Sequence, residues 1–291
     1  MMKKRHKIIL WLGFIVYGLV LFALLTFYRL PAEKILTKAV ESATGGKVFV
    51  SSKKVSASLW NGYRFEDLTW TVQSGSGVVS DRMESLTLSP GYLGLLRGYL
   101  PVEIEGAVAK GTFQVSAGVS VIRGLGKGYA RFKALGINLG DLATVNQTAQ
   151  REIKGKLTAI ADFYGPLDEL RKLNGQGSIL IEDGSVDTRV DAFGLRTIPF
   201  ETLSLPLTVR NGVAGIKDGR LVGPVFTGSL EGQIRLLQNL QASPIQITAS
   251  MRPGPSLKGG GGGNLPLPGN TPVIIRLEGT IGKPLFTLAG G

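Results

Sequence analysis

The chain has no cysteine among its 291 residues, and its single histidine, His6, precedes a long apolar run. The lack of cysteine excludes thiol catalysis, zinc-thiolate sites, haem attachment through cysteine and N-terminal lipidation. The lack of histidine after residue 6 excludes a Ser-His-Asp triad, a Cys-His dyad and imidazole metal sites from the rest of the chain. Carboxylate pairs, Ser-Lys dyads and all-oxygen metal sites are the enzyme chemistries that remain.

These remaining chemistries have little support in the sequence. The densest acidic cluster contains Glu182, Asp183, Asp187 and Asp191, which could bind a hard cation through oxygen ligands. The Asp-Gly pair at residue 183 is also typical of a hairpin turn with solvated carboxylates, and we favour this interpretation. No motif supports a Ser-Lys hydrolase. We therefore expect no catalytic residues, no metal, no cofactor and a protein that is not an enzyme.

An unbroken run of 21 uncharged residues extends from Ile8 to Tyr28, directly after a basic stretch. About 20 apolar residues are needed for an α-helix to cross the hydrocarbon core of a membrane. The alternative is a cleaved secretory signal, but its apolar core is shorter and it ends in small residues, whereas this run ends in bulky ones. Basic flanks stay in the cytoplasm. We expect residues 1–7 to be a cytoplasmic tail, 8–28 a transmembrane anchor and 29–291 an exported domain.

Basic residues outnumber acidic ones and give a formal net charge of +12. Such a balance can indicate nucleic acid, anionic lipid headgroups or acidic protein surfaces as partners. Most of the basic side chains are scattered singly, as at Arg64, Arg82, Arg97 and Lys110, and they form no continuous stripe. This distribution favours a soluble surface beside an anionic membrane, and we expect no nucleic-acid partner.

From residue 47 onward, apolar and polar residues alternate with a period of two, which predicts strands with one buried face. Four Asn-Gly or Asp-Gly pairs, beginning at Asn61, Asp183, Asn211 and Asp218, predict tight hairpin turns. We expect a mainly β protein, a long antiparallel meander. Pro206 interrupts one strand pattern, so that strand should lie at an edge or carry a bulge.

Helical periodicity is limited to short segments. We expect an amphipathic helix after Pro31 that extends to Ala43, and two shorter helices within residues 138–153 and 166–173. Residues 252–272 are rich in Pro and Gly and include five consecutive glycines, which predicts a disordered loop. Strand patterns resume after it, so we interpret the loop as an insertion in one sheet.

The alternating pattern places eight apolar residues on strand faces, and these faces must be covered by protein or by a bound molecule. Leaving one such side chain in water forgoes about 1.5–3 kcal/mol, so eight would forgo about 12–24 kcal/mol. This is comparable with the stability of a whole domain, about 5–15 kcal/mol. The cover is either the sheet closing on itself or a bound molecule such as lipid. The eight residues are Val102, Ile104, Leu203, Leu205, Leu207, Val209, Ile245 and Ile247.

Two lysines and two aromatic residues lie close together near the start of the strand region. Lys53, Lys54, Trp60 and Tyr63 could form a membrane-surface patch, since basic and aromatic side chains favour the headgroup region. The alternative is an ordinary strand pair with its aromatic side chains in the core. The sequence does not distinguish these two interpretations.

Several stretches of the chain resemble one family. They are the apolar run followed by Tyr-Arg-Leu-Pro-Ala-Glu at residues 28–33, the sequence Leu-Asn-Gly-Gln-Gly-Ser-Ile-Leu-Ile-Glu-Asp-Gly at 173–184, and the closing Gly-Thr-Ile-Gly-Lys-Pro-Leu-Phe at 279–286. With these features the chain resembles the type II secretion system protein N (GspN) family and, more distantly, AsmA-type envelope proteins. The five glycines at 259–263 depart from the family pattern.

The resemblance implies a protein with a single transmembrane helix in the bacterial inner membrane and a periplasmic domain that assists type II secretion. The AsmA-type likeness implies a long curved, U-shaped antiparallel sheet whose apolar inner face can hold lipid acyl chains. We therefore carry two hypotheses. The first is a non-enzymatic component of the type II secretion system that contacts its other subunits. The second is an AsmA-like lipid-binding or lipid-transfer protein for phospholipid or lipopolysaccharide acyl chains.

Overall fold

The computed structural model of the chain describes nine segments, which contain all the strands and helices below. Within these segments no helix is both long enough and apolar enough to cross a membrane. The expected anchor at residues 8–28 and the tail before it lie outside the described residues, as does most of the expected loop at 252–272. The described residues are 31–58, 61–74, 77–91, 98–120, 127–149, 151–167, 169–192, 195–254 and 272–289.

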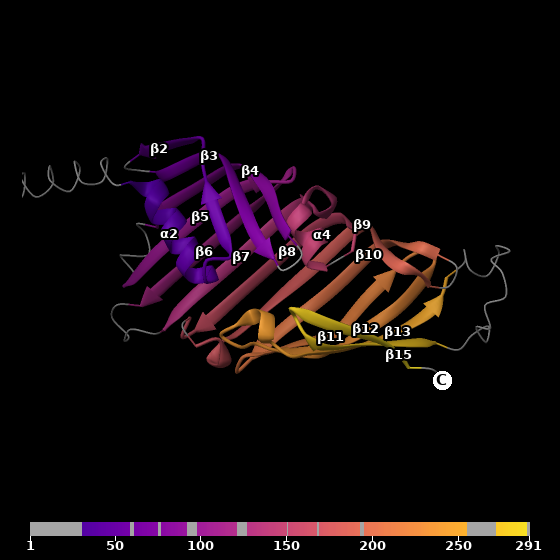
Figure 1. Ribbon diagram of the computed structural model, residues 1–291. Coiled ribbons are helices and arrows are strands. Elements are labelled where there is room, and N and C mark those ends of the chain that lie inside the picture. Colours follow the sequence, from indigo (N-terminus) through magenta and orange to yellow (C-terminus); the bar gives the residue numbers. More distant parts are fainter. Residues whose placement is uncertain are drawn as a thin grey trace, which may run out of the picture.

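One antiparallel sheet of fifteen strands dominates the described residues, as the alternating pattern predicts (Figure 1). The strands follow one another in chain order from β1 to β15, except that β2 pairs with β3 beside β1. The strands are β1 (Val48–Ser51), β2 (Lys54–Ser58), β3 (Gly62–Ser74), β4 (Gly77–Pro90), β5 (Tyr99–Val108), β6 (Gly111–Ser120), β7 (Gly128–Asn138), β8 (Ile153–Gly165), β9 (Asn174–Ala192), β10 (Leu195–Arg210), β11 (Val213–Val222), β12 (Phe226–Arg235), β13 (Ile245–Pro253), β14 (Val273–Thr280) and β15 (Lys283–Ala289).

Helices are few in the described segments, and the longest is the one expected after Pro31. Helix α2 covers Ala32–Thr44 and ends where Gly45 adopts a left-handed φ of 62°. The amide of Gly46 donates to the carbonyl of Glu41 at 2.8 Å, which satisfies one of the free carbonyls at the helix end.

The two shorter helices are smaller than the sequence pattern predicts. Within residues 138–153 the chain forms the 3-10 turn η1 (Leu139–Asp141) and the seven-residue helix α4 (Ala143–Ala149). In the described part of 166–173 the chain forms the 3-10 turn η2 (Leu170–Lys172) and no longer helix. A third turn of this kind, η3, covers Leu240–Ala242. Segments this short cannot offset the cost of helix nucleation, so strand connections override the helical periodicity.

Two of the four predicted hairpin turns are instead irregularities inside long strands. Asn211 and Gly212 form the β10–β11 turn with φ of 48° and 71°, and residue 61 precedes β3 as a turn. Asp183, with φ of 49°, lies inside β9, and Asp218, with φ of 58°, lies inside β11. The prediction of positive φ was right at these two aspartates, but the hairpin prediction was wrong, because a β-bulge requires the same backbone.

Pro206 lies in β10, which pairs with β9 on one side and β11 on the other. The expectation of an edge strand is therefore wrong, and the bulge lies beside Pro206 in the neighbouring strand β11 and not in β10 itself. The register between β10 and β11 shifts between Ser204, opposite Arg220, and Leu207, opposite Ile216, so β11 has one residue more than β10 there. The irregularity accommodates a residue that has no amide to donate.

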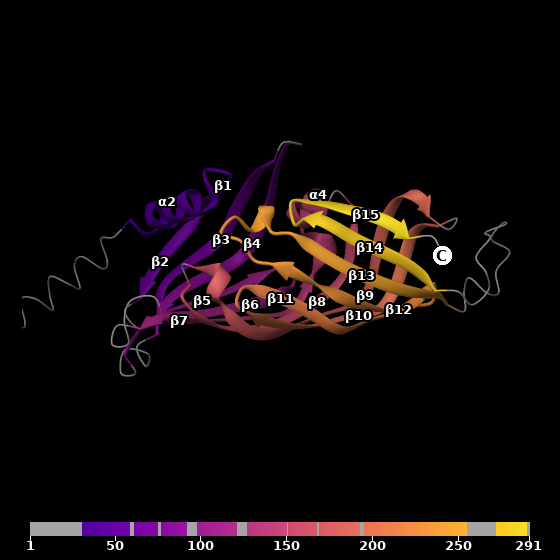
Figure 2. The ribbon, with the colours of Figure 1, turned by 90° about the horizontal axis from the view of Figure 1, so that it is seen from below.

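The sheet curves into a trough (Figure 2). We call the face that carries Phe65, Leu86 and Ile104 the inner face, since α2 packs on it through Ala32 and Leu36. The opposite face is the outer face. Among the described residues, buried apolar side chains form three clusters spread along the sheet instead of one central core, around Phe65 in β3, Ala134 in β7 and Met251 in β13.

The sheet continues across the Pro/Gly-rich segment. Strand β13 ends at Pro253, β14 begins at Val273, and the two strands pair directly, with Ala249 opposite Ile275. The segment between them therefore connects two neighbouring strands of one sheet.

Candidate functional site

The inner face carries rows of apolar side chains that cross the sheet from strand to strand. Successive cross-strand pairs connect Val102 of β5, through β6 to β9, with Val209 of β10. The same row continues through β11 and β12 to Ile245 of β13. Directly opposite residues lie on the same face of a sheet. Three residues that are far apart in the sequence therefore share one face.

A second row lies two residues along each strand and contains the other predicted positions. It connects Ile104 of β5 with Leu207 of β10 and Ile247 of β13 through an unbroken series of pairs. Leu203 and Leu205 precede Leu207 at alternate positions of β10 and stay in register with β9, so they point the same way. All eight predicted apolar residues thus lie on the inner face.

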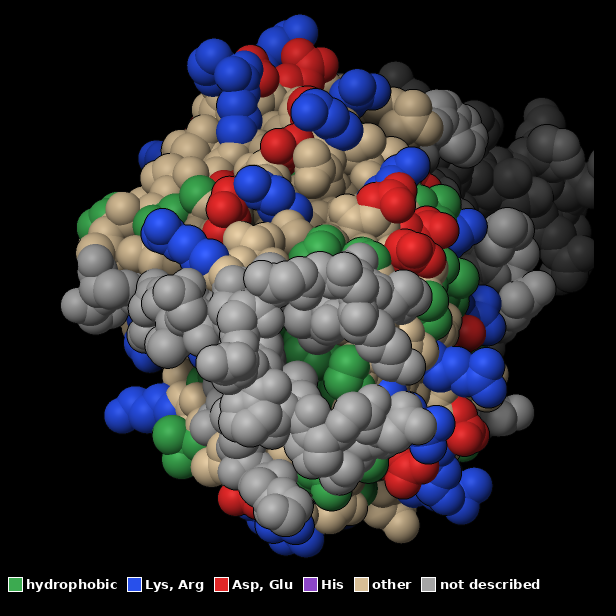
Figure 3. Space-filling view, turned by 90° about the vertical axis from the view of Figure 1, so that its right-hand side faces the viewer, with side chains coloured by type: hydrophobic (Ala, Val, Ile, Leu, Met, Phe, Trp, Pro, Cys, Tyr) green, Lys and Arg blue, Asp and Glu red, His purple; other side chains and the backbone are tan. Residues whose placement is uncertain are grey.

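The curvature of the sheet covers these side chains unevenly. Val209 and Ile245 are buried, whereas Val102 keeps 51% of its surface exposed. The other five residues are half-buried. Viewed from the right-hand side of Figure 1, a few hydrophobic side chains are visible near the centre, and Lys, Arg, Asp and Glu side chains lie around the outline of the molecule (Figure 3). The protein itself covers part of this apolar surface, and the rest remains open to another molecule.

Large side chains on the inner face lie flat over glycines of neighbouring strands. A Cβ atom at Gly106 of β5 would meet the ring of Phe113 in β6, with Cζ only 2.6 Å away. A Cβ at Gly175 of β9 would meet Cδ1 of Phe163 in β8 at 2.8 Å. Rings in this position lie along the sheet and do not project into the trough, so the inner face stays nearly flat there.

Two helices lie against the sheet, and α4 is tied to the inner face by a buried carboxylate. Asp81 of β4 accepts hydrogen bonds from the amides of Ala143 at 2.7 Å and Thr144 at 2.8 Å, and from the Thr144 hydroxyl. Asp81 pairs with Trp70, whose side chain packs against the apolar clusters of the inner face. The β7–β8 connection thereby reaches across the β5–β6 hairpin to β4.

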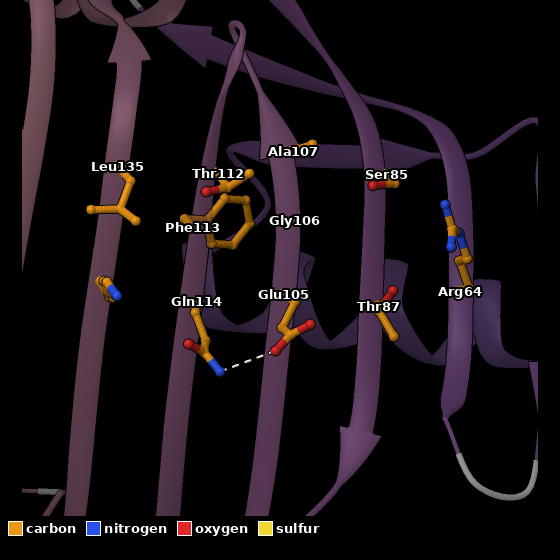
Figure 4. A pocket seen from close by; sticks show the side chains of 11 residues that line it. Arg64, Ser85, Thr87, Glu105, Gly106, Ala107, Thr112, Phe113, Gln114 and Leu135 are labelled. Carbon is orange, nitrogen blue, oxygen red and sulfur yellow. Dashed lines mark hydrogen bonds between the residues drawn. The ribbon is translucent and has the colours of Figure 1, made fainter.

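The outer face is polar and carries a shallow hollow of about 380 Å³ (Figure 4). Long side chains surround small ones there: Arg64, Glu105 and Lys133 stand around Ser85 and Ala107. The amide of Gln114 donates to Glu105 at 3.0 Å. The hollow brings together one acid and two bases but no nucleophile with an adjacent general base, so its geometry supports no reaction.

The structure describes three of the four residues of the possible membrane-surface patch, and two of these, Lys54 and Tyr63, lie on opposite faces. Lys53 pairs with Asp67 at 3.5 Å and Lys54 pairs with Glu66 at 3.3 Å. Lys54 lies on the outer face, whereas Tyr63 packs against the Phe65 cluster on the inner face, and burial raises the pKa of Tyr63. Trp60 lies outside the described residues. Tyr63 thus lies where the alternative interpretation, an ordinary strand pair with its aromatic side chains in the core, places it. Strand pairing puts residues 54 and 63 on opposite faces.

Metal binding has no geometric support in the described segments, where no three or more His, Asp or Glu residues gather as ligands. Glu182 and Asp183 are exposed beside the bulge in β9. The side chain of Asp191 lies outside the described residues.

The sequence pattern missed two features of the inner face: the flat rings over glycines and the role of Asp81. Both depend on which strands become neighbours, and only the glycines in strand patterns could have suggested the first. No protein-family model matches the chain, and neither does any curated protein or any solved structure.

Proposed function

We propose that this chain is a non-enzymatic protein that binds lipid acyl chains along its inner face. The observation that carries the proposal is the continuity of the apolar rows from β5 to β13, in which half-buried aliphatic side chains remain accessible. In soluble domains, a large continuous apolar surface usually marks a site where another molecule binds.

The dimensions and chemistry of the trough favour acyl chains as the occupant. Fourteen strands in sequence, about 4.8 Å apart, give the sheet a path of about 60 Å. A hydrocarbon core about 30 Å thick holds two layers of lipid tails, so one tail spans about 15 Å. The rows named above offer aliphatic and aromatic surface without hydrogen-bonding groups, which suits phospholipid or lipopolysaccharide tails.

The proposed location is the bacterial inner membrane, with the sheet in the periplasm. The support is in the sequence, where an uncharged run at residues 8–28 follows a basic tail. An anchor there would place the sheet beside a source of lipid. The resemblance to AsmA-type envelope proteins agrees with a U-shaped, lipid-holding sheet.

The second candidate is a component of the type II secretion system, which rests on the resemblance to the GspN family at residues 28–33, 173–184 and 279–286. In that case the inner face would receive an apolar segment of another secretion subunit.

Photo-crosslinking in living cells distinguishes the two candidates. A photoreactive amino acid replaces Val102 or Leu205 on the inner face, and Ile160, 44% exposed on the outer face, serves as the matched control. Lipid-sized adducts at residues 102 and 205 but not 160 support lipid binding. Protein-sized adducts at the same two positions support the secretion candidate. Stable protein with no adduct at either position contradicts both.

A further inference from the structure

The two edges of the sheet differ in whether a helix covers their backbone groups. One edge consists of β1 and, beside it, the short β2, both of which pair with β3. Side chains of α2 bond to backbone groups of residues 48, 50 and 52 in and next to β1. An exposed edge is a template for unwanted pairing, and covering it with a helix is one way to prevent this. The bonds join Thr37 Oγ1 to the carbonyl of Val50 at 3.0 Å, the amide of Val48 to Thr44 Oγ1 at 3.2 Å, and the amide of Ser52 to Glu33 Oε1 at 3.1 Å.

The other edge, β15, has no such cover within the described part of the chain. Its strand partner there is β14 alone. Leu285 lies opposite Glu278 on the outer face and keeps 64% of its surface exposed. Lys283 is the single charged residue of the strand. An edge strand with an exposed leucine and one charge is well suited to accept another strand.

We propose that β15 pairs with β15 of a second copy of this chain. Two copies joined at their β15 edges form a sheet whose outermost edges are both formed by β1, which α2 covers, and the short β2 beside it. Head-to-tail association would require β1, which α2 covers, or the five-residue β2, which is a shorter partner than the seven-residue β15 of a second copy. Antiparallel pairing of identical strands is isologous and closes at two copies.

The twofold axis of such a dimer runs perpendicular to the sheet. The inner faces of both copies then lie on the same side, and the two troughs join into one. When the pairing centres on Leu285, the two leucines contact each other on the outer face, and Lys283 of each copy faces Thr287 of the other. No like charges are opposite each other. This proposal does not depend on what the inner face binds.

Disulfide trapping tests the pairing directly, because the natural chain has no cysteine. The purified full-length chain carries one of three substitutions along β15, Lys283→Cys, Leu285→Cys or Thr287→Cys, and is oxidised at micromolar concentration. Facing residues in antiparallel strands are close enough for a disulfide. We expect covalent dimers from Leu285→Cys and none from the control Val55→Cys, which is 36% exposed in β2 at the other edge.

A second variant examines the association without a covalent bond. Leu285→Lys places two like charges opposite each other and removes apolar contact from both copies, so we expect the dimer to weaken by about 100-fold in light scattering. The melting temperature of each copy should not fall, since Leu285 is exposed. A monomeric natural chain with no disulfide dimer from any β15 variant overturns the proposal. So does trapping of the Leu285→Cys variant only to a different protein, because the edge then serves another partner.

Discussion

The ring of Phe113 in β6 lies against Gly106 of β5, in the space where any other residue would place its side chain. The arrangement recurs at Phe163 and Gly175 two strands further on. Because these rings lie flat, they do not project from the inner face in the part of the trough near α2. A glycine in a strand usually weakens it, but here it makes room for a ring to lie flat.

Gly106→Ala should lower the free energy of unfolding by about 1–3 kcal/mol, because the added methyl group forces the ring of Phe113 out of its position. The backbone itself is not the cause, since Gly106 is not among the glycines with positive φ. Thermal or urea unfolding measures the effect. Gly215→Ala is the matched control: its nearest neighbour would be 3.7 Å away, so no loss of stability is expected.

The contact is isolated by adding Phe113→Leu to the Gly106→Ala variant. The smaller side chain should recover much of the lost stability, so the double variant should be more stable than the sum of the single changes predicts. Additive effects, within about 0.5 kcal/mol, would contradict the account of the ring.

Asp81→Ala should destabilise the chain by about 2–3 kcal/mol, since the amides of Ala143 and Thr144 lose a buried, charged acceptor. Hydrogen exchange at residues 143–149 should accelerate. Ser80→Ala is the control on the adjacent residue: its hydroxyl is exposed and bonded only to that of Thr71, so a change below about 0.5 kcal/mol is expected. Unchanged exchange in α4 after the Asp81 substitution would show that other contacts hold the helix.

The pKa of Asp67 is lowered from its ordinary value of 3.8, first by the hydrogen bond from Arg82 and also by the charges of Arg82 and Lys53. A folded pKa below the unfolded one means that the ion pairs stabilise the chain above pH 3.8 and that this contribution is lost as the pH falls through the folded value. Arg82→Gln should raise the pKa of Asp67 in a carboxyl NMR titration. Lys53→Gln should raise it less. If Lys53→Gln raised the pKa of Asp67 more than Arg82→Gln does, Lys53 and not Arg82 would be the main partner of Asp67.

Asp218 occupies a bulge with φ of 58°, where a β-branched residue is strained. Asp218→Val should therefore lower the free energy of unfolding by about 1–2 kcal/mol, whereas Asp218→Gly should leave it nearly unchanged. Chemical unfolding of the two variants checks this. Equal losses from both would mean that the aspartate side chain, and not its backbone conformation, stabilises the bulge.

The sequence predicted the strands and the shared face of the apolar residues because both depend on a period of two. Val102 and Ile245 lie on one face because an unbroken series of directly opposite residues joins them across the strands between. The Asp-Gly pairs specified positive φ at residues 183 and 218, but a turn and a bulge need the same local backbone. Only the pairing of distant strands decides between them.

Other features could not be predicted because they depend on contacts between distant residues, and an alternating pattern does not show which distant residues meet. The carboxylate of Asp81 meets amides more than sixty positions later, and its role as a cap requires the β7–β8 connection to cross a hairpin. The edge cover by Thr37 and Glu33 requires β1 to be the outermost strand. The placement of Lys54 and Tyr63 on opposite faces could not be predicted for the same reason, since strand pairing assigns the two faces.

Mass spectrometry of lipid extracted from the purified chain tests the central claim most directly. The natural chain and two variants are compared: Val102→Arg on the exposed part of the inner face and Ile160→Arg on the outer face, two sites with similar exposure. We predict that the natural chain and Ile160→Arg carry phospholipid or lipopolysaccharide and that Val102→Arg, with an unchanged melting temperature, carries much less. Equal lipid in all three, or none in the natural chain, would contradict an acyl-chain site on the inner face.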